Sequence, residues 1–295
     1  MENSQSNAKD LFLEAGPHGV LVLHGLGSNF LEVAGLARHL NENGFTVHVP
    51  VVSGYSFGAN DDDSTCAQWV DSAEQSYWKL KERCETVSVV GLSMGATLAL
   101  MLTTRVRPTC SVFLSTCLAY DGWAIPWYSF LLRVAPCLPF LKRYKFSESE
   151  PYGLKNSDRR SKVKKSLETK EIADIGAHSL NYQQLSQGIA LMDTTWKALP
   201  LVETPALFVH SVDDETAHPK RVVWAMKEIS SPIKRLHQLG NCYHMITVDL
   251  EKEAVYQETT RFIKQQVNDV LEDPAFEFSP VILQELKNYL RHNSI

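Results

Sequence analysis

A serine flanked by glycines, in the segment GLSMG at residues 91–95, constrains the fold of this 295-residue chain more than any other stretch. Residues 86–90 before it are rich in β-branched side chains, and residues 96–102 after it are good helix formers. This order predicts a strand, a tight turn and a helix, with Ser93 at the turn. Glycine lacks a Cβ, so the strand and the helix can approach closely and the serine hydroxyl points out above the sheet. The simpler alternative is a serine that caps a helix between two loop glycines.

Candidate partners for Ser93 follow it along the chain in the order acid, then histidine. Asp213 and Asp214 come just after a late apolar strand, and their spacing to Pro219 favours Asp214, with Asp213 as the alternative. His244 lies between the last expected strand and a final helix. An imidazole in that place takes the proton from the serine and returns it to the leaving group, while the carboxylate holds the ring. We therefore predict a Ser-His-Asp triad. For three other histidines we expect structural or peripheral roles: His24, His210 and His218.

A second glycine-containing loop, HGLG at residues 24–27, follows the apolar segment 19–23. Glycines leave the backbone of such a loop free to turn an amide inward. In a site built on a strand–turn–helix serine, this loop supplies one N–H to an oxyanion hole and the residue after the serine supplies the other. On that basis the donors are the backbone amides of Leu26 and Met94. The structural alternative is a plain glycine turn between a strand and a helix.

Strands and helices alternate along most of the chain, which predicts an α/β fold with a mostly parallel sheet and reactive groups at the carboxyl ends of its strands. The expected strands are 11–13, 19–23, 45–49, 86–90, 110–114, 205–210 and 233–239. Helices are expected from Asn29, with Glu32 as its capping-box partner, and over 65–84. The predicted organisation is a loose tail at 1–10, a core at 11–116 and 200–268, an inserted helical cap at 117–199 and a C-terminal extension, expected to be helical, at 269–295.

The predicted cap has an aromatic first part and a basic second part. Trp123, Trp127 and Tyr128 stand in an apolar stretch that prolines make too short and broken to span a membrane. We expect these three side chains to line the substrate site, the alternative being packing against the core. Residues 142–170 hold ten Lys or Arg and four Asp or Glu. This balance fits transient contact with anionic lipid or a phosphate-bearing acyl carrier, or else a solvated helix face. Residues 173–198 are predicted to form two helices that return to the core.

Composition excludes some classes of function. The net charge of −5 and pI near 6.1 argue against a nucleic-acid-binding protein. The six cysteines include no C-x-x-C pair and are expected to be reduced thiols in a cytoplasmic protein. Three adjacent aspartates at 61–63 lack further spaced ligands, so no metal is predicted there. The N-terminal residues lack the basic start and apolar core of a signal peptide. Nothing in the sequence indicates the oligomeric state.

Several of these segments together resemble the bacterial carboxylesterase and monoacylglycerol lipase family of α/β hydrolases. The segments are 11–16, 20–25, 91–95, Asp214-Glu215 with Pro219, and 244–247, and the resemblance extends over about residues 11–268. It implies an eight-stranded type of core, a small helical cap, no cofactor, and hydrolysis of short- to medium-chain acyl esters or monoacylglycerol-like lipids. Two departures are visible: Leu26 stands where that family often has phenylalanine, and the region 118–170 is longer, more apolar and more basic.

Two other functions fit the same residues. An acyl thioesterase or acyltransferase would use the same triad, with the basic cap binding a carrier. A hydrolase-fold ligand-binding protein would have lost turnover, although a complete set of candidate catalytic residues argues against it. Dehalogenase chemistry is not expected, because the turn carries serine where those enzymes need aspartate.

Overall fold

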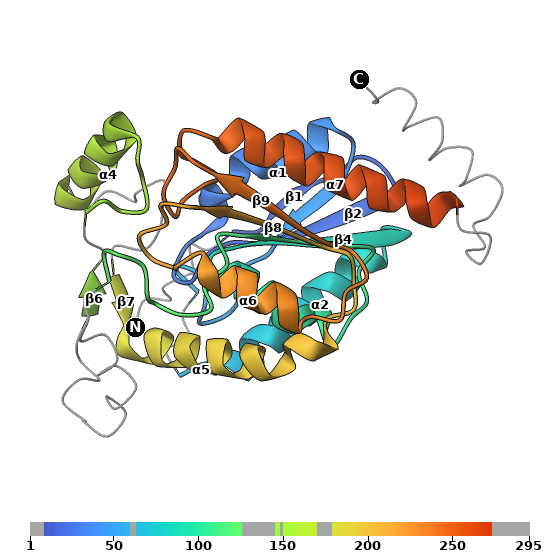
Figure 1. Cartoon of the computed structure of the whole chain (residues 1–295), viewed down its shortest axis with the longest axis horizontal. Coiled ribbons are helices and arrows are strands. Elements are labelled where there is room, and N and C mark those ends of the chain that lie inside the picture. The colour runs from blue at the N-terminus through green and yellow to red at the C-terminus, as the bar shows by residue number, and fades with distance from the viewer. Residues whose placement is uncertain (1–8, 60–62, 126–144, 148–149, 170–178, 273–295) are drawn as a thin grey trace, which may run out of the picture.

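The computed structural model describes residues 9–59, 63–125, 145–147, 150–169 and 179–272. Its centre is a seven-stranded sheet in the order β1-β3-β2-β4-β5-β8-β9 (Figure 1). All neighbouring strands run parallel except the edge strand β1, which is antiparallel to β3. The strands are β1 Leu11–Leu13, β2 His18–Leu23, β3 Thr46–Val49, β4 Thr86–Leu92, β5 Ser111–Leu114, β8 Ala206–Ser211 and β9 Lys234–Leu239. The predicted α/β class is confirmed, and the described residues form one strand fewer than an eight-stranded core.

Helices cover both faces of this sheet (Figure 1). One face carries α1 (Ala34–Glu42) and α7 (Lys252–Glu272), which contact each other. The opposite face carries α2 (Cys66–Lys81), α3 (Met94–Thr103) and α6 (Lys220–Glu228). The polypeptide therefore has two separate apolar cores, one on each side of the sheet.

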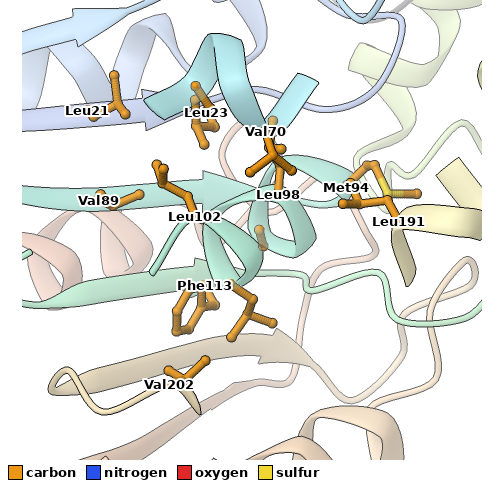
Figure 2. Close-up of a cluster of buried hydrophobic side chains, with 14 of the residues drawn as sticks. Leu21, Leu23, Val70, Val89, Met94, Leu98, Leu102, Phe113, Leu191 and Val202 are labelled. Carbon is orange, nitrogen blue, oxygen red and sulfur yellow. The ribbon is translucent and has the colours of Figure 1, made fainter. Parts of the chain in front are cut away.

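The alternation of side chains along each strand divides the apolar residues between these two cores. In β2, Leu21 and Leu23 point to the α2/α3 side, while Val20 and Val22 point to the α1/α7 side. Figure 2 shows the first core, in which strand residues such as Val89 and Phe113 meet Leu98 and Leu102 of α3. Because the central strands are buried on both faces, they read in the sequence as continuous apolar runs.

The start of the first helix differs from the sequence prediction. Asn29 caps a short 3₁₀ turn, η1 (Phe30–Glu32), by accepting a hydrogen bond from the Leu31 amide, and α1 begins only at Ala34. The Glu32 side chain does not return to Asn29, so the predicted capping box is wrong. Its carboxylate binds the Gly25 amide instead.

The region between β5 and β8 holds a second, two-stranded sheet besides its helices. β6 (Lys145–Ser147) pairs antiparallel with β7 (Ser179–Asn181), and α4 (Ser157–Thr169) lies between them in sequence. We predicted two helices over 173–198, whereas the described residues there form β7 and the single helix α5 (Tyr182–Ala198). Helix α5 packs against α2 and α3 and leads into the 3₁₀ turn η5 (Leu199–Leu201).

The N-terminal end of the described chain is anchored to the core. Asp10, which the sequence prediction placed in a loose tail, accepts a hydrogen bond from the Val51 amide at 2.6 Å and contacts His48 Nε2 at 3.1 Å. Helix α7 continues past the predicted end of the core at residue 268 to Glu272, and most of the predicted C-terminal extension lies outside the described residues. Within the described part of the chain, no helix combines the length and apolar character needed to cross a bilayer.

Candidate active site

Ser93 occupies the turn between β4 and α3 in a strained backbone conformation, with φ 58° and ψ −121°. A Cβ on Gly91 would lie 2.2 Å from the Gly95 carbonyl oxygen, and one on Gly95 would lie 2.2 Å from the Leu23 carbonyl oxygen. Both positions therefore exclude any side chain, which is the physical reason for the glycines of the motif. The Ser93 side chain makes no capping hydrogen bond to α3. The turn is thus built to present a hydroxyl, and the capping alternative does not describe it.

The structure brings the three residues of the predicted triad together. His244 Nε2 lies 2.7 Å from Ser93 Oγ, and His244 Nδ1 lies 2.8 Å from Asp214 Oδ2. Ser93 follows β4, Asp214 follows β8 and His244 follows β9, so all three stand at the carboxyl edge of the parallel sheet. Asp214 is 2% exposed and His244 is 5% exposed. A hydroxyl, an imidazole and a carboxylate so aligned can pass a proton from oxygen to nitrogen.

The two adjacent aspartates have different environments. Besides His244, the Asp214 carboxylate accepts hydrogen bonds from the Thr216 and Ala217 amides at 2.9 and 2.8 Å. Burial raises the pKa of Asp214, but the positive charge of His244 and hydrogen bonds from His210 and His244 outweigh that effect and hold the pKa below its usual value. Asp213 instead points to Lys155 Nζ at 2.8 Å, with its side chain half exposed. The geometry therefore selects Asp214 over Asp213.

His244 has several acidic neighbours. Burial lowers the pKa of His244, but the adjacent Asp214 carboxylate, followed by Glu215 and Glu32, raises it to about 9. The Glu215 carboxylate accepts a hydrogen bond from the backbone amide of His244 at 3.0 Å. An imidazole in this environment holds a proton tightly, as a general base must when it accepts one from a serine.

The two predicted oxyanion donors lie beside Ser93 in a rigid loop and at a helix start. The Gly27 amide donates to the Tyr55 carbonyl at 2.8 Å, and the Tyr55 hydroxyl donates to the His24 carbonyl at 2.8 Å. These bonds fix the loop around Leu26. No acceptor in the described ranges is hydrogen-bonded to the Leu26 or Met94 amide. Met94 also begins α3, whose N-terminal dipole favours negative charge.

Of the three aromatic residues predicted to line the substrate site, the structure describes only Trp123. Trp123 is 63% exposed, donates from Nε1 to the Asp213 carbonyl at 3.1 Å and packs edge-on against Tyr243, so it lies at the rim formed by the acid and histidine loops. Trp127 and Tyr128 fall outside the described residues. Across the site, a Cβ on Gly188 of α5 would lie 3.2 Å from a Leu26 methyl and 3.3 Å from the Met94 methyl. Helix α5 therefore covers the oxyanion side.

Four polar residues near the triad escaped the sequence analysis or were given minor roles. His210 Nε2 lies 2.9 Å from the Ala217 carbonyl and 3.2 Å from Asp214 Oδ2. Asp249 accepts hydrogen bonds from the backbone amides of Lys155 and Tyr243, and so ties the segment before α4 to the histidine loop. Glu32 and Glu215 are the other two. One sequence feature could have identified these residues: each is an ionisable residue inside or beside a motif. Glu215, which directly follows Asp214, is an example.

Comparisons with known proteins identify the family of this chain. The family described as "Serine aminopeptidase, S33" (Hydrolase_4) matches residues 17–251. A thermostable monoacylglycerol lipase from Bacillus sp. (strain H-257) is 30% identical over 258 residues, which cover 87% of this chain and 94% of that protein. A carboxylesterase from Bacillus subtilis (strain 168) is 22% identical over 259 residues, or 87% of this chain and 96% of that protein.

Solved structures show the same fold. The monoacylglycerol lipase of Paleococcus ferrophilus superposes with a TM-score of 0.72 at 16% identity, covering 88% of this chain and 98% of that one. The residues matched by the family span most of the chain, and Ser93, Asp214 and His244 lie within that range. This protein therefore belongs to the Hydrolase_4 (serine aminopeptidase, S33) family of the α/β-hydrolase superfamily.

Proposed function

We propose that this protein is a serine ester hydrolase in which Ser93 is the nucleophile, His244 the general base and acid, and Asp214 the carboxylate that orients the imidazole. The observation that carries the proposal is the continuous chain of contacts from Ser93 Oγ through His244 to Asp214, at 2.7 and 2.8 Å, on a strained turn. The names of the relatives, monoacylglycerol lipase and carboxylesterase, support the same reaction class.

The reaction proceeds through an acyl-enzyme. Ser93 Oγ attacks the ester carbonyl carbon while its proton moves to His244 Nε2, and a tetrahedral oxyanion forms. The amides of Leu26 and Met94 donate to that oxyanion, each contributing about 3 kcal/mol to the transition state. His244 then protonates the leaving alcohol as the C–O bond breaks. Water then attacks the acyl-serine while His244 takes its proton, the bond between the acyl carbon and Ser93 Oγ breaks, and His244 returns the proton to Ser93 Oγ as the carboxylic acid leaves.

The proposed substrates are small carboxylic esters with short- to medium-chain acyl groups or monoacylglycerol-like lipids. Apolar side chains stand next to the oxyanion loop, where an acyl chain would lie: Met94, Leu191 and Met192 belong to one core cluster, and Leu26 packs against it. Trp123 at the opposite rim is a proposed contact for the rest of the substrate. We keep the division into a core at 11–116 and 200–268 and a cap at 117–199 as part of this proposal.

The basic region around α4 is a proposed contact surface for a partner. Helix α4 carries basic residues, of which Arg160 donates to the Leu154 carbonyl and Lys164 contacts Glu150. The net basic charge of this region supports transient contact with anionic lipid or an acyl carrier. The cytoplasmic location predicted from the sequence stays a prediction.

The test compares wild-type protein with Ser93→Ala and, as a matched control, Ser161→Ala in the exposed part of α4. We expect p-nitrophenyl esters and monoacylglycerols to be hydrolysed by wild type and Ser161→Ala, and a fluorophosphonate probe to label both. Ser93→Ala should lose hydrolysis and labelling. Labelling that survives in Ser93→Ala would place the nucleophile elsewhere. Acyl thioesters assayed in parallel separate an esterase from a thioesterase.

A further inference from the structure

Glu32 is a buried carboxylate beside the active site that the proposed mechanism does not use. The residue is 4% exposed, and none of the ion pairs found among the described residues includes it. Burying a charge without a partner is costly, so a carboxylate in such a place needs compensating hydrogen bonds. The bonds that Glu32 makes indicate its role.

Glu32 is hydrogen-bonded to both loops that form the catalytic machinery. Its Oε2 accepts from the Gly25 amide at 2.6 Å, and Gly25 directly precedes the proposed oxyanion donor Leu26. Its backbone carbonyl accepts from the Thr247 hydroxyl at 2.9 Å, three residues after His244. One residue therefore connects the oxyanion loop to the histidine loop, although these loops are more than 200 positions apart in the sequence.

The surrounding backbone is shaped for this contact. A Cβ on Gly25 would lie 3.1 Å from Glu32 Oε2 and 3.2 Å from Oε1, closer than a side chain normally comes. Glycine at position 25 thus admits the carboxylate to the loop backbone. Glu32 itself ends the 3₁₀ turn η1, which Asn29 caps, so its backbone is held in place.

We propose that Glu32 is a positioning residue that holds the oxyanion loop and the histidine loop in register. Beside that role, the charge of its carboxylate contributes to raising the pKa of His244. This inference rests on the proposed hydrolase function and names a part of the site outside the triad. The titratable groups facing His244 are Asp214, Glu215 and Glu32, and those facing Glu32 are His244 and Tyr55. Burial raises the pKa of Glu32, and the Gly25 hydrogen bond opposes that effect.

Two substitutions separate the hydrogen bond from the charge. Glu32→Gln keeps an oxygen that accepts from the Gly25 amide but removes the charge. We expect its kcat at alkaline pH to stay within about threefold of wild type. Without the negative charge the pKa of His244 should fall, so the acid limb of kcat/KM and the NMR titration of the His244 ring should both move to lower pH. Glu32→Leu removes the acceptor as well. Its kcat should fall by about tenfold to a hundredfold with KM nearly unchanged, because the oxyanion loop is no longer fixed.

Two controls and one independent readout complete the experiment. Glu42→Gln, on the exposed side of α1, should leave both measurements at wild-type values. Thr247→Val, which removes the second bond, should lower kcat without moving the His244 titration. A folded Glu32→Leu protein with wild-type kcat, or a Glu32→Gln protein whose His244 titrates as in wild type, would overturn the proposal. If Glu32→Leu does not fold, Thr247→Val decides, because a folded Thr247→Val protein with wild-type kcat would overturn the proposal. The Glu32→Gln titration needs no turnover, so its result is distinct from a failure of the hydrolase proposal.

Discussion

Asp213 and Asp214 are neighbours in the sequence with opposite environments, and this difference predicts opposite effects of the same substitution. Asp214→Asn should lower kcat by about 10⁴-fold, because an amide at this position cannot hold the His244 ring in the required tautomer or stabilise the imidazolium. Asp213→Asn should retain activity within about twofold, since it loses only an ion pair with Lys155 that is open to solvent. Steady-state kinetics on one ester measure both. Equal losses in the two variants would contradict the assignment of Asp214.

The raised pKa of His244 predicts alkaline activity. Serine attack needs the neutral imidazole, so kcat/KM should rise with pH, reach half of its plateau at about pH 9 and level off at higher pH. At pH 7 the activity should be about one hundredth of the plateau, because the His244 pKa then lies about two units above the pH. A pH–rate profile between 6 and 10.5 checks this. A half-maximum near pH 6.5 would show that the acidic neighbours do not act on the imidazole.

The same pKa shift predicts how stability depends on pH. The folded-state pKa of His244 lies above its unfolded value of 6.5, so protonated His244 stabilises the native state below pH 6.5, and that contribution is lost as pH rises through about 9. The Asp214 pKa is lowered, so its contribution is present above pH 3.8 and is lost as pH falls. The Tm difference between wild type and His244→Gln should therefore shrink from pH 6.5 to pH 10. A constant difference would contradict the linkage.

At the scale of single residues, sequence position identified the triad candidates but not their supports. Ser93, Asp214 and His244 each follow a strand in a fixed chain order, and order is visible in a sequence. Glu32 was assigned to a helix cap because local spacing suits that role. Its actual partner, Gly25, lies seven residues away across a loop turn, and its second partner belongs to a distant loop. Such contacts depend on tertiary structure and leave no local pattern.

At the scale of elements, the packing of β4, α3 and the oxyanion loop depends on Gly95. A methyl group there would meet the Leu23 and His24 carbonyl oxygens at 2.2 and 2.4 Å, so the backbone two residues before Leu26 would have to shift. Gly95→Ala should destabilise the fold by about 3 kcal/mol and remove most of the esterase activity. Thermal or urea unfolding with parallel kinetics measures both effects.

Gly240 provides the matched control for Gly95. It lies on the surface after β9, and a Cβ built on it would have no neighbour within 4 Å. Gly240→Ala should therefore change the free energy of unfolding by less than about 0.5 kcal/mol. If the two alanine variants lost similar stability, the close approach of α3 to the oxyanion loop would not be the reason for the second glycine of the motif.

Element boundaries followed from local chemistry wherever that chemistry was unambiguous. Helix α2 begins after Thr65, at the start of the helix predicted over 65–84, and ends at Lys81, three residues before the predicted end. Thr65 and Gln68 form a capping box at its start, which the sequence analysis did not identify. The second sheet was not predicted, because β6 and β7 pair across more than 30 residues and each is only three residues long. Strands so short carry no detectable alternation of apolar and polar side chains.

At the scale of the whole molecule, the alternation of strands and helices predicted the parallel sheet, since central strands buried on both faces have a continuous apolar sequence. We predicted an insertion between β5 and β8 because that alternation stops there. The structure of this segment depends on contacts with the core, such as α5 against α2 and α3, and on the hydrogen bond from the Lys155 amide to Asp249. Those contacts are set by the assembled fold and not by local sequence.

Burial across both cores predicts the reactivity of the cysteines. Among the described cysteines, Cys66 is partly exposed. The other four are at most 5% exposed: Cys84, Cys110, Cys117 and Cys242. Burial raises the pKa of Cys110 to about 12 and that of Cys117 well above its usual value, so these thiols resist ionisation as well as access.

Alkylation of a Cys137→Ser variant tests this prediction, because the substitution leaves only cysteines whose surroundings are described. Iodoacetamide at pH 8 should modify Cys66 alone in the native protein, and peptide mass spectrometry should find the other four thiols modified only after unfolding. Their slow native modification should follow the rate of global opening, since they lie on both faces of one sheet and in both apolar cores. Cys117 lies three residues after β5, and its amide donates to the Ser93 carbonyl. Rapid native modification of Cys117 would mean that the α3/α5 side opens independently of the remaining fold.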